Sequence, residues 1–341
     1  MVSLGRVARG TGLADALARP GGLALGFALD RLLGDPRRGH PVALFGQAAL
    51  RLERHTYADS VAAGAAHLLL LAGTVTTAGW LAERATRTHP LARLALTAAT
   101  TWAVLGGRSL EDEARAVAGH LEAGDLDAAR EQVTHLVSRD PQALDEAGVT
   151  RATIESVAEN TSDAVVAPLV WGALAGVPGL VAHRAINTLD AMVGYRNERY
   201  VRFGKVTART DDLVNWLPAR IGAALAAGAS GPAWRAIRRD APAHPSPNGG
   251  RIEAAFAGAL GIRLGGSNVY GGRVEDRGEL GDGRAARAGD VTRAIRLARR
   301  VQVGALALAV AASALQPRPT ALTLRLREGC RRHLLHKPST D

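Results

Sequence analysis

The sequence is poor in cysteine and aromatic residues, and each scarcity excludes a class of protein. Cys330 is the only cysteine in 341 residues, which excludes a disulfide framework and a zinc site built from several thiolates. Aromatic residues make up 4% of the chain. They are not interleaved with basic residues as they are on surfaces that bind nucleic acid. We therefore expect no nucleic acid among its partners.

Lysine is almost absent, and arginine carries the positive charge. Lys205 and Lys337 are the only lysines among 42 basic residues, and the formal net charge is +10. In a chain this rich in alanine, an arginine surplus more often reflects the base composition of a genome than a nucleic-acid ligand. The surplus also suits a membrane surface or an anionic substrate.

The apolar residues occur in blocks. We identify six candidate membrane spans, at residues 13–29, 61–81, 91–105, 164–182, 217–229 and 301–315. A helix needs about 20 apolar residues to cross a hydrocarbon core of about 30 Å. The pattern predicts a mainly α, multi-pass helical bundle in the cell membrane, formed by one domain over residues 1–341. The alternative is a large soluble α protein with buried, alanine-rich helices.

Polar blocks separate these spans, at residues 106–163, 183–215 and 235–300. The first block is typical of helices. The other two have little apolar periodicity, and we expect loops shaped around a ligand, with almost no β-strand. Residues 316–341 form a basic, proline-containing segment that we expect to be a mobile tail. Gly22-x-x-x-Gly26 and Gly172-x-x-x-Gly176 predict close helix contacts inside two spans.

A row of acidic residues runs into the span that begins at residue 164. Glu155, Glu159 and Asp163 recur every four residues, so a helix places them on one face, with Asn160 beside Asp163. Like charges at this spacing repel each other, and Arg151 offsets only part of the repulsion. A solvated acidic face is the alternative, but a divalent cation such as Mg²⁺ would offset more, since it takes oxygen ligands. We therefore predict a site here.

Acidic and amide groups recur at the edges of the next spans. Asn187 and Asp190 are three residues apart and share a helix face after Arg184. Arg196 and Arg199 follow, and each can form bidentate hydrogen bonds with phosphate or carboxylate. Asp211, Asp212 and Asn215 repeat the pattern before the span at 217–229.

The third polar block contains alternating prolines around His244, followed by Asn248, Gly249 and Gly250. A glycine turn at the start of a helix offers free backbone amides to a phosphate. It is neither a Walker A loop nor a dinucleotide fingerprint, and an ordinary connector stays open. Further along, the block pairs glycines with the amide of Asn268 and the charged groups of Arg273 and Glu275.

Taken together, these strings resemble the CobD/CbiB family of cobalamin biosynthesis, the adenosylcobinamide-phosphate synthases. The resemblance covers residues 29–46, 138–171, 184–220 and 240–283. It depends on six ordered motifs: Asp30–Val42, Arg151–Asp163, Arg184–Tyr200, Asp211–Arg220, His244–Gly250 and Asn268–Gly278. Several long strings in the same order are far more specific than a single glycine motif.

The resemblance implies a carbon–nitrogen ligase. Its substrates would be cobyric acid and aminopropanol or aminopropanol phosphate, and its product cobinamide or cobinamide phosphate. Joining a carboxylate to an amine in water is unfavourable, so ATP and Mg²⁺ are the implied cofactors, with an acyl phosphate as the intermediate. The corrinoid is a substrate here. Membrane lipid and other late enzymes of the pathway are the implied partners.

The predicted roles follow from these motifs. Glu155, Glu159 and Asp163 would hold the metal, with Asp190 beside them, and His244 or Glu275 would accept the proton of the amine. The predicted contacts to substrate and phosphate are Arg151, Asn160, Arg184, Asn187, Arg196, Arg199, Asn248, Gly249, Gly250, Asn268 and Arg273.

This scheme requires distant polar blocks to converge on one pocket. If residues 164–182 crossed the membrane as one helix, Glu155 and Arg196 would lie on opposite sides. We therefore expect this segment to be re-entrant or broken, with the site sunk between helices. Two other functions remain open, namely a Mg²⁺-dependent transferase acting on a lipid phosphate and a non-catalytic scaffold or transporter component.

Overall fold

A computed structural model describes the backbone of residues 4–36, 38–137, 141–142, 144–195, 197–270 and 273–316. Side chains are described within the same ranges, except for residues 4–13, 267–270 and 273–275. Arg196 and residues 317–341 of the tail predicted at residues 316–341 therefore lie outside the described residues.

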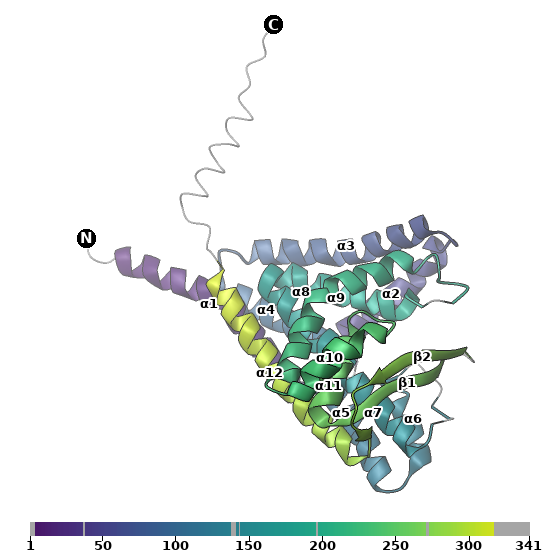
Figure 1. Cartoon of the computed structure of the whole chain (residues 1–341). Helices are drawn as coiled ribbons and strands as arrows, with labels where there is room; N and C mark the ends of the chain where they lie inside the picture. The colour runs from purple at the N-terminus through teal and green to yellow at the C-terminus, as the bar shows by residue number, and fades with distance from the viewer. Residues whose placement is uncertain are drawn as a thin grey trace.

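The described chain is mainly helical, as the sequence predicted (Figure 1). Its α-helices are α1 (Leu4–Leu33), α2 (Pro41–Thr56), α3 (Val61–Ala85), α4 (Pro90–Val104), α5 (Gly107–Glu122), α6 (Leu126–Val133), α7 (Glu146–Thr161), α8 (Ala167–Val193), α9 (Lys205–Ala227), α10 (Gly231–Arg239), α11 (Gly249–Leu260) and α12 (Gly289–Leu315). A π-helical turn (Ser162–Val166) joins α7 to α8, and a 3-10 turn (Ala241–Ala243) precedes α11.

Helices α1 and α4 pack closely because glycine removes the side chain at their contact. A Cβ atom added to Gly22 would lie 2.5 Å from Thr97 Cβ, and one added to Gly26 would lie 2.4 Å from Thr101 Cβ. Contact at this distance is possible only without a side chain. The predicted role of Gly22 and Gly26 in close helix contact is confirmed.

Three stretches are long and apolar enough to cross a membrane: Val61–Ala85, Glu146–Val193 and Gly289–Leu315. Only 22% of the apolar window in α3 is buried inside the protein. Exposed large side chains on this helix include Leu69, Leu70 and Trp80. An apolar helix that leaves so much of its surface uncovered is suited to lipid rather than water. The fold is that of a mainly α membrane protein, as expected.

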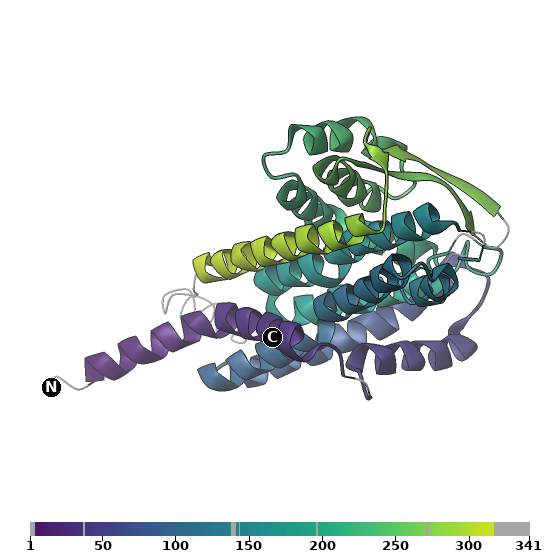
Figure 2. The ribbon, with the colours of Figure 1, turned by 90° about the horizontal axis from the view of Figure 1, so that it is seen from below.

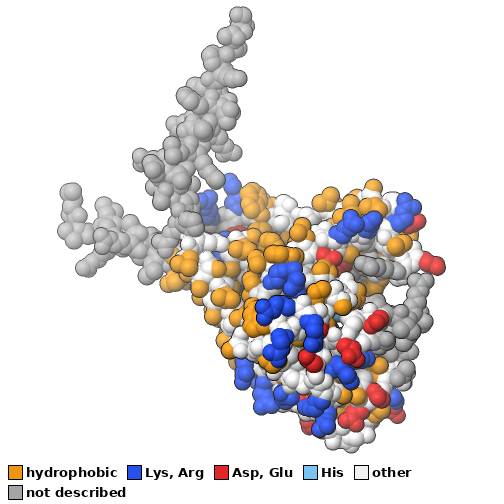
Figure 3. Space-filling model, in the orientation of Figure 1, with side chains coloured by type: hydrophobic (Ala, Val, Ile, Leu, Met, Phe, Trp, Pro, Cys, Tyr) orange, Lys and Arg blue, Asp and Glu red, His pale blue; other side chains and the backbone are white. Residues whose placement is uncertain are grey.

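Charge changes abruptly along α12. Arg293, Arg296, Arg299 and Arg300 lie in its first half, whereas residues 301–315 carry no charge. Figure 3 shows the same division on one face of the molecule, with apolar side chains over the upper part of α12 and basic side chains towards its lower end. Such a boundary is typical of a helix that enters the apolar part of a bilayer.

Helix α8 folds back on itself. Gly176 has φ of 69° and ψ of −148°, a conformation that interrupts the helix, and Pro178 follows two residues later. A Cβ atom on Gly179 would lie 2.3 Å from the carbonyl oxygen of Trp171, so the two limbs, residues 167–175 and 177–193, are in contact. Of the alternatives for residues 164–182, the structure adopts the broken one. Gly176 therefore makes a turn and not a helix contact.

Helices α10 and α11 and the β-strands pack together on one side of the helical bundle (Figure 2). Helices α10 and α11 lie beside a three-stranded sheet, which contains β1 (Ile262–Tyr270), β2 (Arg273–Leu280) and β3 (Arg284–Ala285). Its order is β2-β1-β3, with β1 antiparallel to β2 and parallel to β3. The main hydrophobic core includes Phe256, Ile262 and Leu280 together with residues of the bundle.

The sheet corrects the expectation of almost no strand in residues 235–300. Buried Ile262 and Leu264 alternate with exposed Arg263, but Gly265 and Gly266 then break the pattern. Both glycines have positive φ, and the register of β1 against β2 shifts between Gly265 and Ser267. A bulge of this kind hides the period of two that identifies a strand in sequence.

Candidate functional site

The fold of α8 brings three polar segments together at the base of its two limbs. Asn187 Nδ2 lies 3.5 Å from Asp163 Oδ2 and 3.4 Å from Asp211 Oδ1. Asp163 and Asn187 are 24 residues apart, which would separate them by about 36 Å in a straight helix. The break at Gly176 is therefore what allows them to meet.

More carboxylates surround this contact. The negative charges of Glu159, Asp190 and Asp211 all act on Asp163, and that of Asp212 acts on Asp190. We call these five acidic residues, together with Asn187 and Asn215, the acidic cluster. Its members come from α7, the π-helical turn, α8 and α9.

Amide side chains hold the cluster in place. Asn215 Nδ2 donates to Asp211 Oδ2 at 3.0 Å, and Asn215 Oδ1 lies 2.8 Å from His183 Nε2. Burial raises the pKa of Asp211 to about 6, although the hydrogen bonds from Asn215 and Asn187 act in the opposite direction. A carboxylate this reluctant to carry its charge is stabilised by a cation.

The donor set fits a hard cation such as Mg²⁺, since it consists of carboxylate and amide oxygens. Within the described part of the chain, no three His, Cys, Asp or Glu side chains already have the geometry to hold a metal ion. Mg²⁺ usually takes one or two protein carboxylates and completes its shell with substrate phosphates and water. The cluster therefore fits a metal that arrives with a phosphate ligand.

Arg184 connects the cluster to the N-terminal motif. Its positive charge interacts with both Asp35 and Asp163. Asp35 follows α1, and its Oδ1 lies 3.5 Å from His40 Nε2 at the start of α2. The first, second and third of the motifs therefore converge, as the predicted pocket requires.

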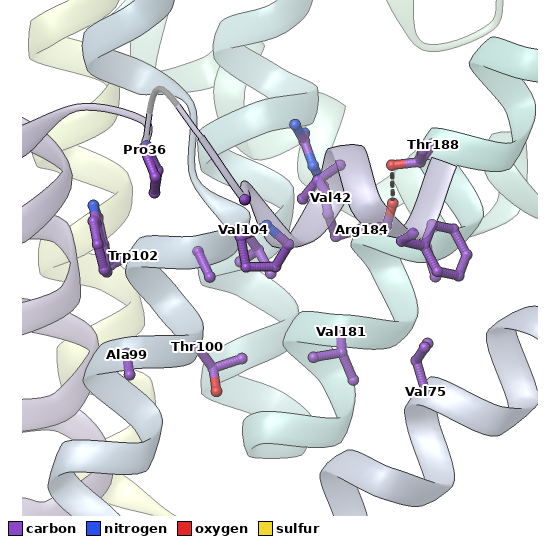
Figure 4. Close-up of a pocket in the computed structure, with 15 residues that line it drawn as sticks. Pro36, Val42, Val75, Ala99, Thr100, Trp102, Val104, Val181, Arg184 and Thr188 are labelled. Atoms are coloured by element: carbon purple, nitrogen blue, oxygen red, sulfur yellow. Dashed lines mark hydrogen bonds between the residues drawn. The ribbon is translucent and has the colours of Figure 1, made fainter. Parts of the chain in front are cut away.

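Arg184 also lines an apolar cavity of about 580 Å³. Figure 4 shows Trp102 and Val104 of α4, Val75 of α3 and Val181 of α8 around it. Pro36 before α2 and the first residues of α2 contribute further apolar side chains. The lining comprises Pro36, Gly39, Pro41, Val42, Phe45, Val75, Ala99, Thr100, Trp102, Ala103, Val104, Val181, Arg184, Ala185 and Thr188. An apolar cavity that ends at one charged residue beside polar groups is the usual form of a small-molecule site.

Glu155 and Arg151 lie elsewhere, against the β sheet. Glu155 Oε1 accepts a hydrogen bond of 2.8 Å from the Gly265 amide, and Arg151 donates to the Gly265 carbonyl. Arg151 lines a separate polar cavity, together with Arg263 and Glu279. The structure thus does not bring Glu155 together with Asp163, because two further helical turns separate them.

The turn at residues 248–250 starts α11 beside the cluster. Asn248 Nδ2 donates to the backbone carbonyl of Asp212 at 2.8 Å, which ties the turn to α9. The Gly249 amide donates to Ser246 Oγ at 3.0 Å. A Cβ atom on Gly250 would lie 2.4 Å from His244 Cβ. The turn is therefore closed by its own side chains.

His244 is buried inside the same turn. Its Nδ1 accepts from the Ser246 amide at 3.1 Å, and its Nε2 lies 3.6 Å from Glu253 Oε1. The side chain is only 2% exposed. This geometry suits a residue that shapes the turn better than one that exchanges protons with a substrate.

The other predicted residues are dispersed. Arg199 binds Glu53 Oε1 at 2.8 Å and stacks on Tyr57, away from the cluster. Asn160 donates to the carbonyl of Ser156 in its own helix. Asn268, Arg273 and Glu275 lie on β1 and β2, but their side chains are outside the described residues.

Asp211 and Asn215 belong to the acidic cluster but were not among the predicted site residues. The signal was present, because acidic and amide groups recur before the span at 217–229 just as they do before 164. His183 had no such signal, since it lies within an apolar stretch. Only its contact with Asn215 in the structure shows that His183 adjoins the acidic cluster.

These features define a class: helical membrane proteins with a cluster of carboxylate and amide side chains at the base of a folded-back helix, next to an apolar cavity. The chain belongs to the CobD/CbiB family, because the model for CobD/Cbib protein matches residues 23–298. The match includes every motif from which the resemblance was inferred.

Curated relatives of the chain are consistent with this family membership. A cobalamin biosynthesis protein CobD from Mycobacterium tuberculosis is 50% identical over 297 residues, which cover 85% of this chain and 94% of the relative. CobD of Chromobacterium violaceum is 45% identical over 304 residues, 86% of this chain and 96% of the relative. CobD of Geobacter metallireducens is 46% identical over 266 residues, 74% of this chain and 84% of the relative. No solved structure matches the chain.

Proposed function

We propose that the protein acts in cobalamin biosynthesis and forms an amide bond between the free carboxylate of cobyric acid and the amine of aminopropanol or its phosphate. Membership of the CobD/CbiB family and the names of the CobD relatives support the pathway. The observation that carries the chemistry is the meeting of Asp163, Asn187 and Asp211 beside Arg184.

In this proposal the cofactors are ATP and Mg²⁺, held by Asp163 and Asp190 with Glu159 at the edge. These three carboxylates are half-buried and repel one another, so binding of a divalent cation would stabilise them. When bound, the nucleotide and its metal supply the phosphoryl group that activates the substrate carboxylate. Asp190 takes the role predicted for Glu155, because Glu155 is engaged by the Gly265 amide.

Arg184 would orient the anionic groups of the reactants, since it is the basic residue that interacts with Asp163. The cavity next to Arg184 has apolar walls, which suit the methyl-bearing edge of a corrinoid. The amino alcohol is small and polar, and we place it on the acidic side of Arg184. The bundle would lie in the cell membrane with this end open to the cytosol, where ATP is available.

The direct test is synthesis by the purified protein in detergent, with cobyric acid, MgATP and either aminopropanol or aminopropanol phosphate. We expect cobinamide or cobinamide phosphate, identified by mass spectrometry. Asp163→Asn and Asp190→Asn should lower the rate at least about 100-fold, since each removes a charge that the metal requires. Asp127→Asn, on the exposed surface of α6, is the matched control and should keep the full rate.

A cellular test separates this function from its alternatives. A cell that lacks its own synthase is supplied with cobyric acid, and the corrinoid formed with the wild-type chain or the Asp163→Asn variant is identified. A lipid-phosphate transferase would form no cobinamide in either test. If both chains restored cobamide synthesis equally, the protein would be a scaffold and the catalytic proposal would be wrong.

A further inference from the structure

The break in α8 leaves backbone groups without helical partners in an apolar part of the fold. Gly176 interrupts the hydrogen bonds between successive turns, which affects the carbonyls of Ala173 and Leu174 and the amide of Val177. In an apolar surrounding such groups require other partners, since each unsatisfied one is costly.

Three polar side chains supply those partners, one from α1, one from α3 and one from the residue that follows α12. Arg19 of α1 donates from Nη1 to the Ala173 carbonyl at 3.4 Å. Gln316, directly after α12, donates from Nε2 to the Ala173 carbonyl at 2.7 Å and to the Leu174 carbonyl at 3.3 Å. Glu83, near the end of α3, accepts from the Val177 amide at 3.2 Å through Oε2. The turn is therefore bonded on both sides of Gly176.

Arg19 of α1 joins these two side chains. Its Nη2 lies 3.0 Å from Glu83 Oε1, and its Nη1 donates to Gln316 Oε1 at 2.7 Å. The side chains of Arg19 and Glu83 are each 17% exposed, so the ion pair is largely removed from solvent. We call Arg19, Glu83 and Gln316 the tip clamp.

The clamp and the acidic cluster lie at opposite ends of the same two limbs. The limbs touch along their length, since a Cβ atom on Gly172 would lie 2.8 Å from Leu180 Cδ2. A slip of one limb against the other at the turn therefore moves Asn187 relative to Asp163 at the base. Packed helices shift as rigid units, so the displacement is transmitted rather than absorbed.

We propose that Glu83, with Arg19 and Gln316, is a positioning residue for the reaction: the tip clamp sets the register of the two limbs of α8 and thereby the geometry of the acidic cluster. This inference rests on the proposed function for its catalytic consequence. Its structural part, the register of α8, stands independently and can be measured without any substrate.

The first experiment compares Glu83→Ala and Glu83→Gln in the full-length protein in detergent. Amide hydrogen exchange of residues 173–179 and of the segments around Asp163 and Asn187 is followed by mass spectrometry. We expect exchange in all three to rise at least about tenfold in Glu83→Ala, since the turn loses its acceptor. Glu83→Gln keeps an acceptor for the Val177 amide and should show a smaller rise.

Enzyme kinetics add a measurement that a purely structural role would not change. Well below the melting temperature, we expect kcat of Glu83→Ala to fall at least about tenfold while KM changes little, because ligands still bind but are misaligned. Arg93→Ala is the matched control. It removes a different ion pair of α1, the one between Asp15 and Arg93 of α4, and should leave both readouts unchanged.

A charge swap distinguishes the ion pair from the backbone contact. Arg19→Glu combined with Glu83→Arg restores opposite charges but leaves the Val177 amide without a carboxylate acceptor, so we expect no recovery. Unchanged exchange in Glu83→Ala, or full recovery by the swap, would overturn the inference. If exchange rises as expected but no variant forms cobinamide, and the wild type does not either, the proposed reaction fails and the register role survives.

Discussion

Asn187 lies between two carboxylates, with its Nδ2 3.5 Å from Asp163 Oδ2 and 3.4 Å from Asp211 Oδ1. Both distances are long for hydrogen bonds, so the amide separates the two acids more than it bonds tightly to either. Its dipole nevertheless faces negative charge on both sides. The residue therefore keeps the carboxylates of Asp163 and Asp211 apart.

The first prediction concerns this amide. Asn187→Leu keeps the approximate size of the side chain but removes the donor between Asp163 and Asp211. We expect a loss of about 1–3 kcal/mol in stability, because the buried carboxylate of Asp211 and the half-buried carboxylate of Asp163 lose a partner. Thermal unfolding in detergent without Mg²⁺ measures it. Asn197→Ala, in an exposed turn, is the control and should cost clearly less. Equal losses in both variants would refute the shielding role.

The second prediction concerns Glu111, which is 0% exposed and binds three arginines from three helices. Its carboxylate accepts from Arg31 at 2.6 Å, from Arg115 at 2.8 Å and from Arg299 at 2.7 Å, which joins α1, α5 and α12. Glu111→Gln leaves three guanidinium groups around a neutral side chain. We expect destabilisation of about 3–5 kcal/mol by chemical unfolding.

The control for Glu111 lies on the same helix. Asp112 also pairs with Arg108 and Arg115, but its side chain is 46% exposed. Asp112→Asn should cost at most about 1 kcal/mol, as surface ion pairs do. A similar cost for both variants would show that burial of Glu111 does not strengthen the network.

The third prediction concerns two glycines of α3. A Cβ atom on Gly64 would lie 1.7 Å from the Phe203 carbonyl oxygen, whereas one on Gly73 would have nothing within 4 Å. Gly64→Ala forces two backbone segments apart and should destabilise the protein by at least about 1–3 kcal/mol. Gly73→Ala should stabilise it by about 0.5–1 kcal/mol, because alanine favours a helix. The opposite order of melting temperatures would contradict the packing of α3 described here.

The fourth prediction concerns the pH dependence of stability. Burial raises the pKa of Asp30 to about 6, and the negative charge of Asp35 adds to the effect. Between about pH 4 and 6 the folded state holds a proton that the unfolded state has released. Stability from this residue is therefore present at low pH and is lost as pH rises through 6.

Asp30→Asn cannot titrate, so it should become more stable relative to the wild type as pH rises from 4.5 to 7.5. A shift of about two pKa units corresponds to about 3 kcal/mol at most. Melting temperatures of both proteins across this range provide the measurement. The exposed Asp127→Asn should show no such trend. A constant difference between Asp30→Asn and the wild type would indicate that Asp30 stays ionised.

Helical class, membrane character and family could be inferred from local pattern. Apolar blocks identified α3 and α12, and the repeat from Glu155 to Asp163 correctly placed all three residues on helical segments. The same repeat could not show which of them face a common site. In the structure Glu155 faces Gly265 and Asp163 faces Asn187, since helical spacing fixes a face but not its partner.

The β hairpin of β1 and β2 could not be predicted from the sequence, because it too depends on contacts between separate segments. Strands β1 and β2 are held by pairing across a bulge at Gly265, and this pairing is absent from the pattern of either strand alone. Segments whose stability comes from distant partners carry a weak local signal.

By itself, the sequence determined where helices form and which segments avoid water, because these depend on neighbouring residues and on burial of apolar surface. The tertiary structure alone decided that α8 turns at Gly176 and that Asp163, Asn187 and Asp211 meet. The backbone of that turn is satisfied by Arg19 of α1, Glu83 of α3 and Gln316, which follows α12. Contacts between residues so far apart along the chain exist only once the helices have packed.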